Sequence, residues 1–104
     1  MTTWFVSRHR GAQAWVASEG FPVDRVVEHL ENEVVGPGDI VIGTLPVHLA
    51  AAVCARGARY LHLALDVPAD KRGVDMDAES MRLHGARLEE YRVERVAAWS
   101  PHEL

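Results

Sequence analysis

Length, composition and charge exclude several classes of protein. The chain has 104 residues, of which 48% are hydrophobic and 25% are charged, so the sequence predicts one globular domain over residues 1–104 and is too short for two. Its formal net charge of −4 argues against a protein that coats long nucleic acid, since that function usually requires a broad basic face.

The first half of the sequence predicts three strands and one helix. Residues 3–7 are β-branched and aromatic, which is typical of a buried strand. Residues 12–19 have helical spacing of their apolar side chains, and Gly20 and Pro22 end the helix. Residues 25–30 alternate like a strand, and the apolar run 40–42 follows a turn and predicts a central strand.

The second half predicts two helices and two strands. Pro46 suits a first helical turn and Gly57 suits the end of a helix, so residues 46–56 should be helical. Residues 60–65 alternate like a strand, and a loop over 66–75 leads to a short helix at 77–83. Residues 87–96 should form a last strand, although their apolar positions also suit a helix.

This order of elements predicts a compact, Rossmann-like, three-layer α/β domain with a mainly parallel central sheet of about five strands and flanking helices. In such sheets ligands bind beyond the carboxyl ends of the strands. Residues 7–11 and residues 43–48 each follow a core strand and precede a helix. If the two strands are parallel, both loops lie at the same edge of the sheet.

The first of these loops has the composition of an anion-binding site. It places a hydroxyl, two guanidinium groups, an imidazole and a glycine, from Ser7, Arg8, His9, Arg10 and Gly11, before a helix N-terminus. Unpaired backbone N–H groups and the helix dipole favour an anion there, and arginine adds bidentate hydrogen bonds to phosphate oxygens. Histidine titrates near neutral pH. A solvated basic turn remains the alternative.

The second loop combines a position at which a ligand can come close to the backbone with a candidate general base. Gly43 lets a ligand come close to the main chain, and Thr44 either caps the following helix or bonds a phosphate or ribose. His48 falls in the first helical turn, where the dipole favours the neutral imidazole that a general base requires. The alternative is a plain helix cap followed by an exposed histidine.

The remaining polar residues give weaker signals. Tyr60 suits packing, Asp66 could orient a histidine or arginine, and Lys71 with Arg72 could close over a bound anion. No histidine pair has the spacing of a zinc site, so we expect no metal and no cofactor. The single cysteine, Cys54, cannot form a disulfide within the chain. Without a long apolar run or an N-terminal targeting pattern, we expect a cytoplasmic protein with no membrane partner.

Several of these segments together resemble a small family of type III CRISPR accessory proteins, related to the CRISPR-associated Rossmann-fold sensor domains. The resemblance extends from Thr3 to about Val93. It is carried by Trp4-Phe5-Val6-Ser7-Arg8-His9 with Gly11-Ala12 and Trp15, by Asp39 with Val41-Ile42-Gly43-Thr44-Leu45-Pro46-Val47, and by Gly57-Ala58-Arg59-Tyr60.

The resemblance implies a ring nuclease, a phosphodiesterase that degrades a cyclic oligoadenylate messenger and so switches off type III CRISPR signalling. It implies cyclic tetra-adenylate bound across the two-fold axis of a homodimer and cleaved without a metal. Arg8 would contact the scissile phosphate, His9 would position or protonate the leaving group, and His48 is the candidate base. The two histidines could exchange roles, or geometry alone could suffice. The ligand-binding residues would be Ser7, Arg10, Gly11, Gly43, Thr44, Leu45 and Pro46.

Two other functions remain open at this point. The chain could sense or sequester the cyclic nucleotide without cleaving it. It could also be an interaction protein in which the basic loop at 7–11 is an ordinary solvated surface.

Overall fold

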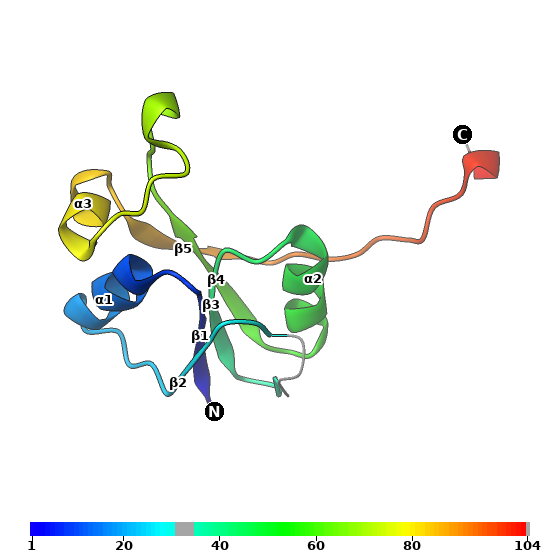
Figure 1. Cartoon of the computed structure of the whole chain (residues 1–104). Helices are drawn as coiled ribbons and strands as arrows, with labels where there is room; N and C mark the ends of the chain where they lie inside the picture. The colour runs from blue at the N-terminus through cyan, green and yellow to red at the C-terminus, as the bar shows by residue number, and fades with distance from the viewer. Residues whose placement is uncertain (31–34, 104) are drawn as a thin grey trace.

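A computed structural model describes residues 1–30 and 35–103 of the chain (Figure 1). The strands are β1 (Thr3–Val6), β2 (Arg25–Val27), β3 (Ile40–Gly43), β4 (Arg59–Ala64) and β5 (Arg87–Tyr91). The helices are α1 (Arg10–Ser18), α2 (Val47–Ala55) and α3 (Ala78–Leu83), with 3-10 turns η1 (Ala69–Lys71) and η2 (Pro101–Glu103). None of the described helices has the length and hydropathy needed to cross a membrane.

The five strands form one sheet in the order β2-β1-β3-β4-β5. β1 lies parallel to β2 and to β3, β3 lies parallel to β4, and only β5 runs antiparallel to its neighbour. Helices α1 and α3 lie together on one side of the sheet and α2 lies on the other (Figure 1). The predicted fold class, a Rossmann-like α/β domain with a mainly parallel sheet, is therefore confirmed.

Alternation along the central strands divides the core into two halves. Trp4 and Val41 face α2, whereas their neighbours Phe5 and Ile42 face α1 and α3. Because successive side chains of a strand point to opposite faces, a strand covered on both faces must be apolar at every position. Val41 is fully buried, which agrees with its place in the middle of the sheet.

Three element boundaries differ by at least two residues from those expected from the sequence. Helix α1 begins at Arg10 rather than at residue 12, because the His9 carbonyl already accepts a hydrogen bond from the Gln13 N–H at 3.2 Å. The predicted loop 7–11 is therefore shorter, and its last two residues are helical. Strand β2 ends at Val27 because it is an edge strand that pairs only with the short β1.

The last strand is also shorter than expected. β5 ends at Tyr91, which pairs with Tyr60 near the start of β4, so further residues would extend past the strand that supports them. The helical alternative for this segment is wrong for residues 87–91.

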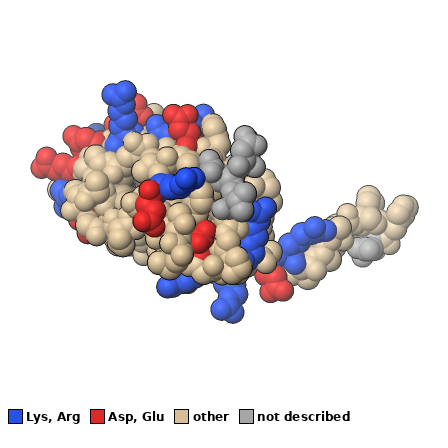
Figure 2. Space-filling view, turned by 90° about the horizontal axis from the view of Figure 1, so that it is seen from below, with Lys and Arg blue, Asp and Glu red and all other residues tan. Residues whose placement is uncertain are grey.

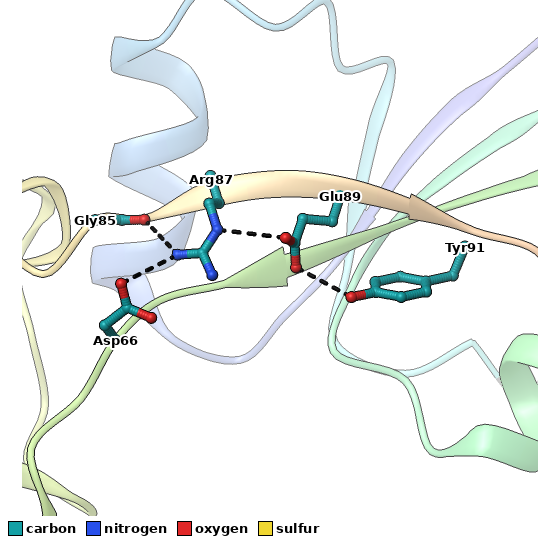
Figure 3. Close-up of polar contacts among 5 residues, drawn as sticks. All are labelled: Asp66, Gly85, Arg87, Glu89 and Tyr91. Atoms are coloured by element: carbon teal, nitrogen blue, oxygen red, sulfur yellow. Dashed lines mark hydrogen bonds and ion pairs between the residues drawn. The ribbon is translucent and has the colours of Figure 1, made fainter.

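Polar side chains cover the exposed face of this edge strand (Figure 3). Arg87 donates to the Gly85 carbonyl at 3.0 Å and to Asp66 at 3.4 Å, and its Nε lies 3.4 Å from Glu89. The Tyr91 hydroxyl donates to the same Glu89 carboxylate at 3.1 Å. Charged side chains on an edge strand discourage pairing with another sheet. The arginine that Asp66 contacts is thus Arg87, on the neighbouring strand.

A buried carboxylate joins the beginnings of the two central strands. Asp39 is 8% exposed, and its oxygens accept hydrogen bonds from the Gly36 N–H at 3.0 Å, the Thr2 N–H at 2.9 Å and the Trp4 indole N–H at 3.2 Å. These donors hold the pKa of Asp39 below its ordinary value, and the Gly36 N–H has the largest effect. The turn before β3 is thereby fixed to the start of β1.

Asp39→Asn should lower the melting temperature at neutral pH. It should also make the melting temperature less dependent on pH in the acid range. A carboxyl whose pKa is lowered by folding stabilises the native state above its unfolded pKa, ordinarily 3.8, and this contribution is lost as the pH falls through the folded pKa. Thermal melts between pH 7 and about pH 3 should therefore show a difference from wild type that narrows toward acid. Asp70→Asn, at an exposed aspartate of η1, is the control, and a constant difference would contradict this role of Asp39.

Candidate functional site

A cavity of about 840 Å³ lies beyond the carboxyl ends of the central strands. The connection after β1 leads to β2 at one side, whereas the connection after β3 leads to β4 at the other. This divergence opens a crevice in doubly wound sheets. The prediction that residues 7–11 lie at the same edge as the loop after β3 is confirmed. The cavity is lined from these two loops by Ser7, Arg8, His9, Arg10, Gly11, Gly43 and Thr44.

Local hydrogen bonds fix the backbone of the first loop. The Ser7 N–H donates to the Val27 carbonyl at 2.9 Å, and the Ser7 hydroxyl oxygen accepts from the His9 N–H at 3.0 Å. The Gln13 side-chain amide donates to the Ser7 carbonyl at 3.1 Å. The hydroxyl of Ser7 thus shapes the turn, and its own hydrogen can still be donated to a ligand.

The helix that follows has an uncapped N-terminus. His9 is the N-cap residue of α1, yet its side chain makes no capping hydrogen bond, and the first turn contains no acidic residue. The first backbone N–H groups of a helix have no acceptor within the helix, so they favour an anion. The His9 and Asp75 side chains are 76% and 100% exposed, with His9 Nδ1 3.9 Å from the carboxylate. A pair this exposed contributes little to stability, so the imidazole can meet a ligand.

Gly11 is required by packing between two backbones. A Cβ atom at this position would lie 1.6 Å from the Met76 carbonyl oxygen, so the first turn of α1 presses against the segment that leads into α3. The sequence predicted Gly11 as a ligand-binding residue, and it does line the cavity. The lack of space for a side chain at this position, however, comes from the contact with Met76.

The second loop is held by a buried tyrosine. Tyr60 is 3% exposed, and its hydroxyl oxygen accepts from the Leu45 N–H at 2.8 Å. The same hydroxyl lies 3.1 Å from the Gly43 carbonyl and 2.7 Å from His62 Nδ1. Burial raises the pKa of Tyr60, which keeps the phenol protonated. This positioning of the loop was not predicted, since a tyrosine at the start of a strand indicates packing alone.

The structure separates the predicted residues of the second loop. Gly43 and Thr44 line the cavity, whereas Leu45 packs into the core on the α2 side. Pro46, not Thr44, is the N-cap of α2, which leaves the exposed threonine without a capping role. His48 lines a different groove, between α2 and residues 92–95. The structure thus brings the 7–11 loop together with Gly43 and Thr44, but it does not bring His48 to them.

The segment between β4 and α3 completes the cavity. It rises above the carboxyl ends of the strands in Figure 1 and adds Lys71 and Arg72 to the lining, as the sequence suggested for a bound anion. The apolar part of the lining was not predicted as part of a site; it is formed by Phe5, Leu63, Leu65, Val67, Val74, Met76 and Met81. The alternating leucines of β4 indicated a buried face, but not that this face extends into a cavity.

The end of the molecule opposite the cavity is not predominantly cationic (Figure 2). Figure 2 views the end at which β1 begins, opposite the cavity, and there acidic and basic side chains are interspersed. Within residues 1–30 and 35–103, no three His, Cys, Asp or Glu side chains come together as they would around a metal ion.

Gly11→Ala should destabilise the protein by about 1–3 kcal/mol, because the added methyl group must displace the Met76 backbone. Urea denaturation measures this free energy of unfolding. Gly36→Ala is a matched control, since its Cβ would meet nothing closer than Asp39 at 4.0 Å. Equal effects of the two substitutions would mean that α1 and the Met76 segment are not in tight contact.

Tyr60→Phe should cost about 1–3 kcal/mol, because it leaves the half-buried Leu45 N–H and the Gly43 carbonyl without their partner. It should also speed hydrogen exchange of the Leu45 amide, which NMR can follow. Tyr91→Phe removes a hydroxyl from a residue that is 48% exposed and should change stability by less than about 0.5 kcal/mol. Unchanged exchange at Leu45 in Tyr60→Phe would show that the hydroxyl does not hold the loop.

Comparison with known proteins identifies a family for this chain. No curated protein and no solved structure matches it. The model of the family described as "Putative CRISPR-associated protein (Cas_VVA1548)" matches residues 4–94, from within β1 to just beyond β5. The matched residues include both loops of the cavity and the segment that covers it. Because the match spans most of its length, the chain belongs to this family of CRISPR-associated proteins.

Proposed function

We propose that this protein is a ring nuclease that binds cyclic tetra-adenylate and cleaves it without a metal, which would switch off type III CRISPR signalling. One observation carries the proposal: a cavity at the carboxyl edge of the sheet has a cationic rim and an apolar wall. A nucleotide has the same two parts, an anionic phosphate and an apolar face on its base.

The rim supplies charge for phosphate recognition. Arg8 comes from the loop before α1, Arg10 is the first residue of α1, and Lys71 and Arg72 come from the segment between β4 and α3. Arginine forms bidentate, charge-assisted hydrogen bonds with phosphate oxygens, and the uncapped N-terminus of α1 adds backbone donors. A local concentration of cations is compatible with a chain whose net charge is −4.

The size of the cavity favours a site shared by two protomers. Its volume, about 840 Å³, falls within the range of about 300–1,000 Å³ that is typical of pockets for drug-sized ligands. A ring of four nucleotides is larger than such a ligand, so one protomer would hold part of it. A two-fold dimer would present two equivalent cavities to a ring that has two-fold symmetry.

The proposed cleavage is an internal transfer. The ribose 2′-hydroxyl attacks the adjacent phosphorus, a bond forms between that oxygen and phosphorus, and the bond from phosphorus to the 5′-oxygen breaks. The products are a 2′,3′-cyclic phosphate and a free 5′-hydroxyl. Arg8 would neutralise the non-bridging oxygens, and His9 would give a proton to the departing oxygen. The proton of the attacking hydroxyl would pass to solvent, because His48 lines a separate groove of the same protomer.

The position of His48 also favours a second function, binding without cleavage. Among the described residues of one protomer that line the cavity, His9 is the one histidine. One exposed imidazole provides one proton transfer, and a sensor that sequesters the messenger would need none.

Mass spectrometry of cyclic tetra-adenylate incubated with the protein and EDTA tests the proposal. We expect linear products with cyclic phosphate ends, and a rate at least roughly 100-fold lower in Arg8→Ala, the typical cost of removing one donor to the transition state. Arg56→Ala removes the same charge at the C-cap of α2 and should cleave at the wild-type rate.

Each other outcome has a definite meaning. An intact ring with tight binding would support the sensor. An absence of binding at micromolar protein would reject both functions. Wild-type cleavage by Arg8→Ala would mean that another loop holds the scissile phosphate. Strong loss in His48→Ala would mean that this residue reaches the ring from a partner protomer.

A further inference from the structure

A second groove, of about 940 Å³, lies on the other side of the sheet from α1. One wall is the outer face of α2, including Val47 and Ala51, and the other is residues 92–95, which follow β5. The two walls are joined where the Val93 N–H lies 3.5 Å from the Cys54 sulfur. Arg92 and Arg95 flank the groove.

Helix α2 has more apolar surface than the sheet can cover. Ala50 and Val53 face the core and are each 2% exposed, whereas Val47 is 72% exposed. His48 is the single polar residue among the nine of this helix, Val-His-Leu-Ala-Ala-Ala-Val-Cys-Ala. A helix that is apolar around its circumference is typical of one buried on more than one side. The outer face of α2 therefore requires a cover that a single copy of the chain does not provide among its described residues.

The C-terminal segment also exposes large apolar side chains to solvent. After Tyr91 it passes α2 and runs away from the body of the molecule (Figure 1). Val96 is 96% exposed and Trp99 is 68% exposed. Tryptophan is strongly enriched among the residues that dominate interface energies, because its ring buries a large apolar area. The chain thus carries an apolar anchor that its own fold leaves in solvent.

The sequence of this segment disfavours its return to the groove from which it starts. Residues 93–99, Val-Glu-Arg-Val-Ala-Ala-Trp, contain no Gly, Pro, Asn or Asp, which are the residues that favour chain reversal. To reach its own groove, Trp99 would have to turn back within about six residues. A second copy can receive the segment while it stays extended.

We propose that the α2 groove binds residues 96–99 of a second copy of this chain, so that two copies exchange their C-terminal segments. The Trp99 ring would lie on the apolar face of α2, and the guanidinium groups of Arg92 and Arg95 would pack over it. A two-fold axis makes the exchange reciprocal, so both exposed anchors and both grooves are covered. The interface does not depend on the proposed nuclease activity, and Trp99 lies outside the residues that match the family model.

The oligomeric state of the full chain tests this interface without any nucleotide. Light scattering after size exclusion should give a dimer for wild type. Trp99→Ser and Val47→Asp, from the two sides of the contact, should each raise the dimer dissociation constant at least roughly 10-fold. Leu83→Asp is the control, since Leu83 on α3 is 79% exposed but lies across the sheet. A monomeric wild type, or equal weakening by Leu83→Asp, would overturn the proposal.

A disulfide trap identifies the occupant of the groove. Ala98→Cys places a thiol beside Trp99, and Cys54, the chain's single native cysteine, supplies the other thiol within the groove. Oxidation with diamide, which accepts the two hydrogens of the thiol pair, should give a covalent dimer on non-reducing gels. The cross-link should be lost in Ala98→Cys/Cys54→Ser. A disulfide within one chain, at monomer mass, would show that the segment folds onto its own groove and would reject the exchange.

Discussion

The parallel pairing of β1 with β3 is the constraint on which the other features of the molecule depend. Phe5 pairs with Ile42 and Val6 with Gly43, and a Cβ on this glycine would lie 2.9 Å from the Val6 carbonyl oxygen. The two strands end side by side, and the chain leaves them in opposite directions. That divergence creates the cavity, and it gives the cavity one wall from each loop.

The cavity has an exposed cationic part and a buried apolar part. The cations at its rim, such as Arg8 and Lys71, are exposed, whereas the apolar wall continues the core that Phe5 and Leu63 form. The charge of the rim can therefore be altered without removing core packing. Tyr60 connects the other half of the core, on the α2 side, to the second loop, since its ring is buried among those core residues while its hydroxyl accepts from the Leu45 N–H.

Helix α2 has a comparable division between its two sides. Its inner side packs on the sheet, and its outer side forms a groove with the residues that follow β5. The antiparallel course of β5 is what carries the C-terminal segment past this helix, because a parallel edge strand would end at the opposite edge. The candidate site and the proposed interface are thus consequences of one sheet topology.

The sequence by itself determined the fold class, the order of the elements, and the meeting of the 7–11 loop with Gly43 and Thr44. These features follow from local information: alternation along strands, helical spacing, turn residues, and the rule that parallel strands end at one edge. Residues 40–42 predicted a strand buried on both faces because all three are apolar. The residues that suggested a CRISPR-associated family also lie in or beside these elements.

Only the tertiary structure decided how side chains far apart in the sequence meet. His48 lies outside the cavity because Ala50 and Val53 turn the inner face of α2 toward the sheet. Successive residues of a helix are rotated by about 100°, so His48, which comes two residues before Ala50, lies on the outer side of α2. The contact of Gly11 with Met76 and the bond of Tyr60 to Leu45 likewise depend on packing between separate elements. Periodicity gives each element its inner face, but the packing of the elements decides which outer residues share a site.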